Sequence, residues 1–141
     1  MSETKLNRQL GDVDIALRVA IVALALGTAY IHLTLGGLLF ALTAFGYGAF
    51  AAALIVPLAL AERYRWLFRL GLIGYTLSVV GGWVVDGPRY DIAYVTKAIE
   101  VALIALVAVD FARRDGNPIE RIRELLRPVI GRPHGPASGR A

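Results

Sequence analysis

The residue with the clearest chemical potential is Glu100, a carboxylate in the middle of an apolar stretch. It is the ninth of the eighteen residues from Ile92 to Val109, a length close to that of one membrane crossing. Lys97 precedes it by three residues, so the two side chains share a helix face and can pair. Ionisable groups inside a membrane are costly and are therefore functional candidates. Two interpretations stay open: an ion pair that orients the helix, or a proton- or cation-binding carboxylate tuned by the ammonium.

A histidine extends this pair into a candidate polar cluster. His32 occurs near one end of the first apolar stretch, and Lys97 lies toward the corresponding end of the fourth. In an antiparallel bundle these ends meet, so we expect one cluster with neighbouring tyrosines, made of His32, Lys97, Glu100, Tyr94 and Tyr30. A structural, hydrogen-bonded histidine is the alternative. As a haem ligand His32 would need a second subunit, since His134 is the other histidine and lies in the tail.

The remaining chemistry is sparse. The sequence has no hydrolase triad, phosphate loop, zinc-binding pair or nucleotide fingerprint. It has no cysteine, which excludes disulfides, thiolate metal sites and thiol nucleophiles. We therefore predict no catalytic residue, no metal and no cofactor. The net charge of +4 comes from basic residues beside apolar stretches, where lipid head groups explain them better than nucleic acid does.

The elements that must position these residues are four membrane spans. The chain is 57% hydrophobic and 18% charged, and its apolar residues fall into blocks of about 20. We predict an all-α integral membrane protein, a four-transmembrane-helix bundle with short loops and a C-terminal amphipathic helix. The expected parts are an N-terminal tail (1–11), a transmembrane domain (12–114, with spans at about 15–35, 38–60, 66–85 and 92–109) and a basic tail (115–141, with the amphipathic helix at about 118–130).

Local signals predict where these helices begin and end. Asp12 or Asp14 can cap the first span, and Asp91 the fourth. Gly36-Gly37 predicts a tight turn, and Asn117-Pro118 a helix start with asparagine as the cap.

Charged residues near the first and third spans are expected to anchor them. Asp14 and Arg18 are four residues apart and are expected to pair. Arg69 is expected to extend its side chain toward head groups.

The distribution of basic residues predicts the orientation. If the N-terminus is cytoplasmic, the outer side carries a single basic residue, Arg89. The cytoplasmic side then carries Lys5, Arg8, Arg63, Arg65, Arg113, Arg114 and the tail. The positive-inside rule therefore predicts a multi-pass protein of the cell membrane with both termini in the cytoplasm.

Small residues predict how the spans pack, because lipid tails remove the hydrophobic drive between helices. They recur every four residues in two spans, and we expect close backbone approach there. These stripes are Ala44, Gly48 and Ala52 in the second span, and Gly74, Ser78 and Gly82 in the third.

Short motifs in all four spans resemble those of a protein family. They are Tyr30-Ile31-His32-Leu33, Gly46-Tyr47, Trp83 before Gly87, and Lys97-Ala98-Ile99-Glu100. They resemble small four-span membrane proteins of archaea and bacteria that are grouped as a domain of unknown function. The resemblance implies a four-helix bundle and supplies no activity. The chain is also similar in size to the small multidrug-resistance exporters, but their essential glutamate lies in the first span.

Three functional hypotheses follow. The favoured one is a non-enzymatic accessory or interaction subunit whose partners are the lipid bilayer and a membrane protein or a second copy of the chain. The second is a small proton- or cation-coupled transporter or channel that uses Glu100. The third is a haem- or quinone-binding redox subunit that uses His32.

Overall fold

The computed structural model describes residues 3–57 and 62–130, and these residues are almost entirely helical. No strand occurs in these two ranges. The helices are α1 (Glu3–Leu35), α2 (Leu38–Ile55), α4 (Arg65–Asp86), α5 (Asp91–Arg114) and α6 (Pro118–Ile130).

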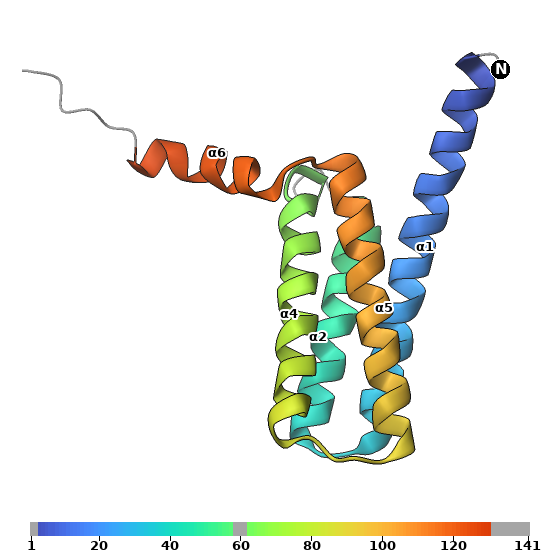
Figure 1. The fold of residues 1–141 in the computed structure, drawn as a ribbon, viewed down its shortest axis with the longest axis vertical. Coiled ribbons are helices and arrows are strands. Elements are labelled where there is room, and N and C mark those ends of the chain that lie inside the picture. The colour runs from blue at the N-terminus through green and yellow to red at the C-terminus, as the bar shows by residue number, and fades with distance from the viewer. Residues whose placement is uncertain (1–2, 58–61, 131–141) are drawn as a thin grey trace, which may run out of the picture.

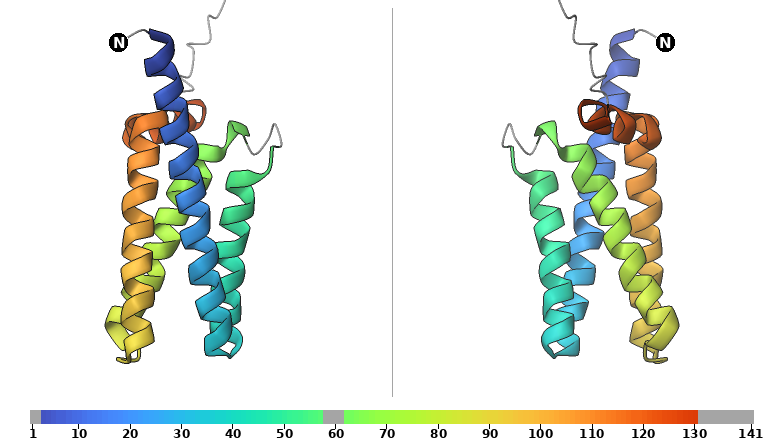
Figure 2. Two further views of the ribbon diagram at one scale, coloured as in Figure 1. Left: turned by 90° about the vertical axis from the view of Figure 1, so that its right-hand side faces the viewer. Right: turned by 90° about the vertical axis from the view of Figure 1, so that its left-hand side faces the viewer.

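Four of these helices form an up-and-down bundle (Figure 1). Helix α1 packs against α2 and α5, and α4 packs against α5 and α2, so each helix has two neighbours. The α1–α2 and α4–α5 turns lie at one end, which we call the turn end, and they stand apart in Figure 2. Helix α6 leaves sideways from the opposite end, which we call the terminal end.

Among the residues that the structure describes, four helices are long and apolar enough to cross a membrane: Gln9–Leu35 within α1, and the whole of α2, α4 and α5. Large apolar side chains also cover the outside of the bundle. Leu38 is 77% exposed and Val85 is 85% exposed. An apolar outer surface of this extent is typical of a lipid-facing bundle. The all-helical class with four such helices agrees with the sequence-based prediction.

Two helix ends differ from the prediction. Helix α1 begins at Glu3, so Asp12 and Asp14 lie inside the helix and do not cap it. The residues before Asp12 are mostly good helix formers, and one glycine costs only about 1 kcal/mol. Helix α2 ends at Ile55, and the rest of its predicted range lies partly in residues 58–61, outside the described ranges. Val56 is extended because Pro57 disfavours the helical conformation at the residue before it.

Two other ends follow the predicted signals. Gly36 and Gly37 have φ angles of +73° and +87°, which allow the sharp reversal between α1 and α2. Asn117 Oδ1 accepts a 3.0 Å hydrogen bond from the backbone N–H of Ile119, and Pro118 is the first residue of α6. Asp91 is not the cap of α5 but its first residue, where a carboxylate still favours the positive end of the helix.

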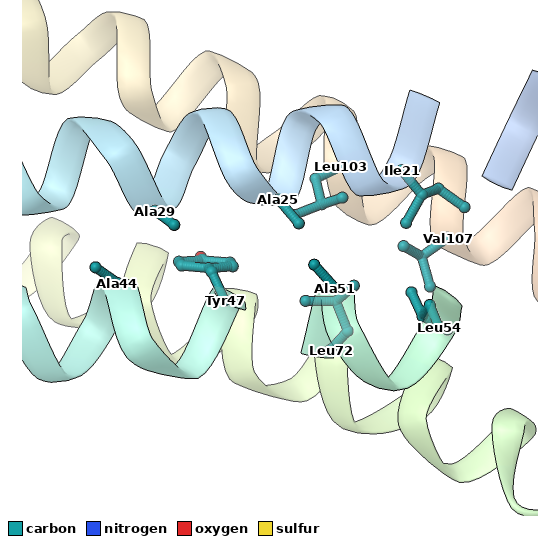
Figure 3. Packing of buried hydrophobic residues seen from close by; sticks show 10 residues of the cluster. All are labelled: Ile21, Ala25, Ala29, Ala44, Tyr47, Ala51, Leu54, Leu72, Leu103 and Val107. Carbon is teal, nitrogen blue, oxygen red and sulfur yellow. The ribbon is translucent and has the colours of Figure 1, made fainter. Parts of the chain in front are cut away.

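The buried core runs along the axis of the bundle (Figure 3). Alanines on α1 and α2 face each other, and small side chains there let the two backbones approach. Larger side chains from α4 and α5 fill the remaining space. The core residues are Ile21, Ala25, Ala29, Ala44, Tyr47, Ala51, Leu54, Leu72, Leu103 and Val107.

The predicted small-residue stripes are only partly in this core. Ala44 is buried and Gly48 half-buried, but Ala52 is exposed. On α4 the expected stripe is wrong, since all three of its members are exposed (Gly74, Ser78 and Gly82).

Close contact between α2 and α4 depends on two other glycines. A Cβ atom at Gly46 would collide with the Tyr75 ring, and one at Gly71 would meet Phe50 Cε1 at 2.9 Å. These glycines accept an aromatic ring from the facing helix, which a count of small residues along one helix does not reveal.

Candidate functional site

Helix α5 places a buried ion pair near the middle of the bundle. Lys97 Nζ donates a 2.6 Å hydrogen bond to Glu100 Oε2, and the Glu100 side chain is fully buried. The pair forms because residues three apart lie on one face of a helix. A buried carboxylate without such a partner would be strongly destabilised.

Helix α1 brings His32 to the other oxygen of the same carboxylate. His32 Nδ1 lies 2.9 Å from the backbone oxygen of Thr28, and because a carbonyl oxygen only accepts, Nδ1 carries the proton. Nε2 then faces Glu100 Oε1 at 3.7 Å. This distance is too long for a hydrogen bond, although the two groups face each other. Lys97, Glu100 and His32 thus form one cluster, which we call the buried triad.

Tyr47 on α2 completes the surroundings of the triad. Its side chain is fully buried, and its hydroxyl lies beside the Glu100 carboxylate and the Thr76 hydroxyl. Within the described ranges, neither the Tyr47 hydroxyl nor Glu100 Oε1 has a hydrogen-bond partner of good geometry. A buried polar atom without a partner costs about 1–3 kcal/mol. An unpaired donor and an unpaired acceptor thus occur on two neighbouring side chains that are both fully buried.

A cavity of about 760 Å³ lies between the α1–α2 hairpin and the α4–α5 hairpin at the turn end. We call it the turn-end cavity. Apolar side chains form most of its wall, among them Leu39, Leu42 and Phe45. Polar groups come from His32, Thr96 and Lys97, which belong to the buried triad or lie next to it in sequence, and also from Thr43, Tyr75, Ser78 and Asp86. The cavity is therefore mainly apolar, with hydrogen-bonding groups on the side that faces Glu100 and a carboxylate, Asp86, elsewhere in its wall.

The predicted polar cluster is brought together in part. His32, Lys97 and Glu100 meet, whereas Tyr30 is 69% exposed and Tyr94 is 52% exposed. Tyr30 precedes His32 by two residues, which places it about 200° around the helix and hence on the opposite face. Tyr94 packs edge-on against Trp83, with ring centroids 5.2 Å apart. These two tyrosines are not part of the site.

Tyr47 was not among the predicted members of the cluster, although the sequence holds a signal for it. It is the tenth of the eighteen residues of α2, which places it at the middle of its span, as Glu100 is in the fourth. Matching the depth of polar residues on different spans would have selected it.

A second charged layer lies at the terminal end. Arg69 on α4 is 4% exposed and donates a 2.7 Å hydrogen bond from Nε to Asp110 Oδ2. Its Nη1 also donates to Asp115 at 2.6 Å. Arg114 Nε donates to the other oxygen of Asp110 at 2.7 Å. Asp110 is thus held by two guanidinium groups, one of them on a neighbouring helix.

This network corrects two expectations. Arg69 is not directed toward head groups but is buried in an ion pair. Asp14 pairs with Arg113 and Arg114 of α5, at 3.3 and 3.4 Å, rather than with Arg18. The reason is that α1 and α5 are neighbours in the bundle, so a partner on the facing helix replaces the partner one turn away.

Within the described ranges, no three histidine, cysteine, aspartate or glutamate side chains lie close enough to hold a metal ion. Comparisons with protein-family models, with curated proteins and with solved structures found no match, so the resemblance drawn from the short motifs stays an expectation.

Proposed function

We propose that the chain is a non-enzymatic membrane subunit that binds a lipid-soluble molecule with a carbonyl-bearing head group, of the quinone class, in the turn-end cavity. The observation that carries the proposal is the position of the cavity, which is walled by apolar side chains and adjoins a fully buried carboxylate. Sites for small molecules typically have volumes of about 300–1,000 Å³ and combine apolar walls with a few polar groups. The turn-end cavity fits both criteria.

The polar groups of the cavity near Glu100 suit a ligand that accepts hydrogen bonds. Lys97 has three donor hydrogens and uses one on Glu100, so an ammonium N–H is left for a ligand carbonyl. The apolar wall would hold the rest of the molecule. Each of these features supports a ligand with one polar end.

Haem fits this site less well. Both ring nitrogens of His32 face other groups, Nδ1 the Thr28 carbonyl and Nε2 the Glu100 carboxylate. An iron ligand needs one nitrogen free of such a neighbour. His134, the other histidine, lies outside the described ranges.

A channel is also less well supported. Leu72, Leu103 and Val107 are fully buried between the buried triad and the Arg69–Asp110 pair. These three side chains form an apolar layer with no room for a hydrated ion. Lys97 moreover neutralises Glu100, which weakens the attraction of the carboxylate for a cation.

Ligand binding can be tested by thermal unfolding of the purified protein in mild detergent with decylubiquinone as the probe. A ligand at about 100 times its Kd stabilises the folded state by about 2.7 kcal/mol, so we expect a saturable rise in Tm. An alkane of the same chain length, which lacks the carbonyl groups, should give a much smaller rise.

Two neighbouring glycines provide a matched pair of variants for this test. Gly82 lines the cavity and Gly81 does not, and a Cβ atom at either position meets nothing within 4 Å. Gly82→Leu should therefore remove most of the decylubiquinone effect, whereas Gly81→Leu should keep it. An equal effect in both variants, or none in the unmodified protein, would show that the cavity is not a quinone site.

Membrane insertion and orientation form a further part of the proposal. The four apolar helices and the excess of basic residues at the terminal end favour a bundle that crosses the cell membrane with both termini in the cytoplasm. Reporter fusions at Ala141 and in the turn from Asp86 to Asp91 should therefore report opposite sides of the membrane. Reporters on the same side would contradict a four-span arrangement.

A further inference from the structure

The terminal end holds a recess of about 360 Å³ whose lining is dominated by arginine. We call it the arginine recess. Its wall contains six guanidinium groups against two carboxylates, and one tryptophan. The lining residues are Arg18, Arg63, Arg65, Arg69, Arg114, Arg121, Glu62, Asp115 and Trp66.

Part of this positive charge is compensated within the protein. Arg69 and Arg114 are paired with the carboxylates of the second charged layer. Arg65 has a single long contact, with Nη2 3.8 Å from an exposed glutamate, Glu62. Arg121 likewise pairs at 3.6 Å with an exposed glutamate, Glu124. Exposed pairs of this length contribute little, about 0–1 kcal/mol.

The other part is uncompensated. Within the described ranges, Arg18 and Arg63 take part in no ion pair. Arg18 is half-buried, and its charge lies near those of three arginines, Arg65, Arg69 and Arg114, and near a single carboxylate, Asp110, which is already paired with two of them. The Nε of Arg65 is buried and has no hydrogen-bond partner. Like charges held together around a recess repel one another, and an anion in the recess would relieve that repulsion.

The guanidinium donors of the recess favour phosphate as the bound anion. Guanidinium groups bind phosphate through paired N–H donors, more strongly and with better geometry than a point charge does. The recess also lies where the apolar parts of α1, α4 and α5 end, with Trp66 in its wall, and tryptophan is enriched at the level of lipid head groups. Helix α6, which leaves sideways at this end (Figure 1), contributes Arg121.

We infer that the arginine recess is a binding site for the phosphate group of an anionic phospholipid head group. A lipid is favoured over free phosphate because the recess adjoins apolar helix surfaces on which acyl chains can lie. An anionic head group is favoured over a choline head group because the choline ammonium would meet the excess positive charge. This inference does not depend on the ligand proposed for the turn-end cavity.

Native mass spectrometry of the full chain in detergent can test the site, because mass identifies the bound species. The protein is titrated separately with phosphatidylglycerol, phosphatidylcholine and inorganic phosphate. We expect one saturable phosphatidylglycerol site, with weaker binding of phosphatidylcholine. Equal binding of the two lipids would overturn the inference. If inorganic phosphate binds and phosphatidylglycerol shows no preference over phosphatidylcholine, the recess is not a lipid site.

Variants distinguish a built site from diffuse attraction to a basic surface. Arg18→Gln removes a charge from the wall of the recess and leaves the Arg69–Asp110 pair in place. Because it removes a charge-assisted hydrogen bond to the phosphate, we expect the Kd for phosphatidylglycerol to increase about tenfold. Arg63→Gln should act in the same direction, and as Arg63 is exposed its loss leaves the packing intact. Arg123→Gln is the matched control, since it removes the same charge from α6 outside the recess and should change Kd by less than about twofold. Equal weakening by all three variants would overturn the inference.

Discussion

Asp110→Asn is expected to be among the most destabilising single substitutions in the chain. The substitution keeps the shape of the side chain but removes the carboxylate that both Arg69 and Arg114 contact at 2.7 Å. The guanidinium of Arg69, which is 4% exposed, then keeps Asp115 as its counter-charge but loses the ion pair that joins α4 to Asp110. Breaking a buried ion pair by removing one partner costs about 3–5 kcal/mol. Unfolding of the purified protein in mixed micelles, followed by circular dichroism, would measure the loss.

Two further variants make this expectation specific. Glu62→Gln breaks the long contact with Arg65 on an exposed side chain and should cost less than about 1 kcal/mol. The double variant Arg69→Met/Asp110→Leu removes both charges and should recover much of the stability that Asp110→Asn loses. If Asp110→Asn costs no more than Glu62→Gln, the pair does not hold α4 against α5.

The second large effect is expected for the buried triad. Lys97→Met leaves Glu100 without its 2.6 Å partner, so the carboxylate must stay charged and unpaired or take up a proton. On membrane-insertion scales a lone charge near the midplane costs about 2.5–3.5 kcal/mol, and we expect a loss of that order. Glu100→Gln should cost less, because Lys97 lines the turn-end cavity and can turn its ammonium into it.

A double-mutant cycle measures the coupling between these two residues. Lys97→Met/Glu100→Gln should be more stable than the sum of the single losses implies. Lys97→Met/Asp110→Asn is the matched control, because Lys97 and Asp110 are 13 residues apart, about 20 Å along the helix, and the two losses should add. Simple additivity of the Lys97 and Glu100 changes would falsify the coupling.

The parts of the fold that the sequence predicts are those set by local patterns. Four apolar blocks predict four helices, and Gly36-Gly37 and Asn117-Pro118 predict a turn and a helix start that the structure contains. The Lys97–Glu100 pair was predictable for the same reason, since its geometry depends only on a spacing of three residues within one helix.

The parts that the sequence did not reveal depend on which helices are neighbours. Asp14 has an arginine four residues away, but pairs instead with arginines on α5. Arg69 and Asp110 are 41 residues apart in the chain. They meet because each is the fifth residue from the terminal end of its helix. Spacing along one helix carries no information about such pairs, whereas the depth of each charge below the helix end does.

The rotation of each helix about its own axis was equally hidden. The stripe Gly74, Ser78 and Gly82 has the spacing of a packing motif, yet all three residues are exposed, and two of them line the turn-end cavity instead of packing against a helix. The rotation of α2 and α4 depends instead on two aromatic rings, Phe50 on α2 and Tyr75 on α4. A glycine on the facing helix must lie opposite each ring.

The apolar layer of Leu72, Leu103 and Val107 has an electrical consequence. It separates the buried triad from the charged layer at the terminal end, so in an energised membrane part of the voltage drop would fall across it. One charge that crosses the whole drop gains about 2.3 kcal/mol per 100 mV. A charged molecule that enters the turn-end cavity as far as Lys97 would cross part of that drop, so its affinity would depend on the membrane voltage, whereas the affinity of an uncharged quinone would not.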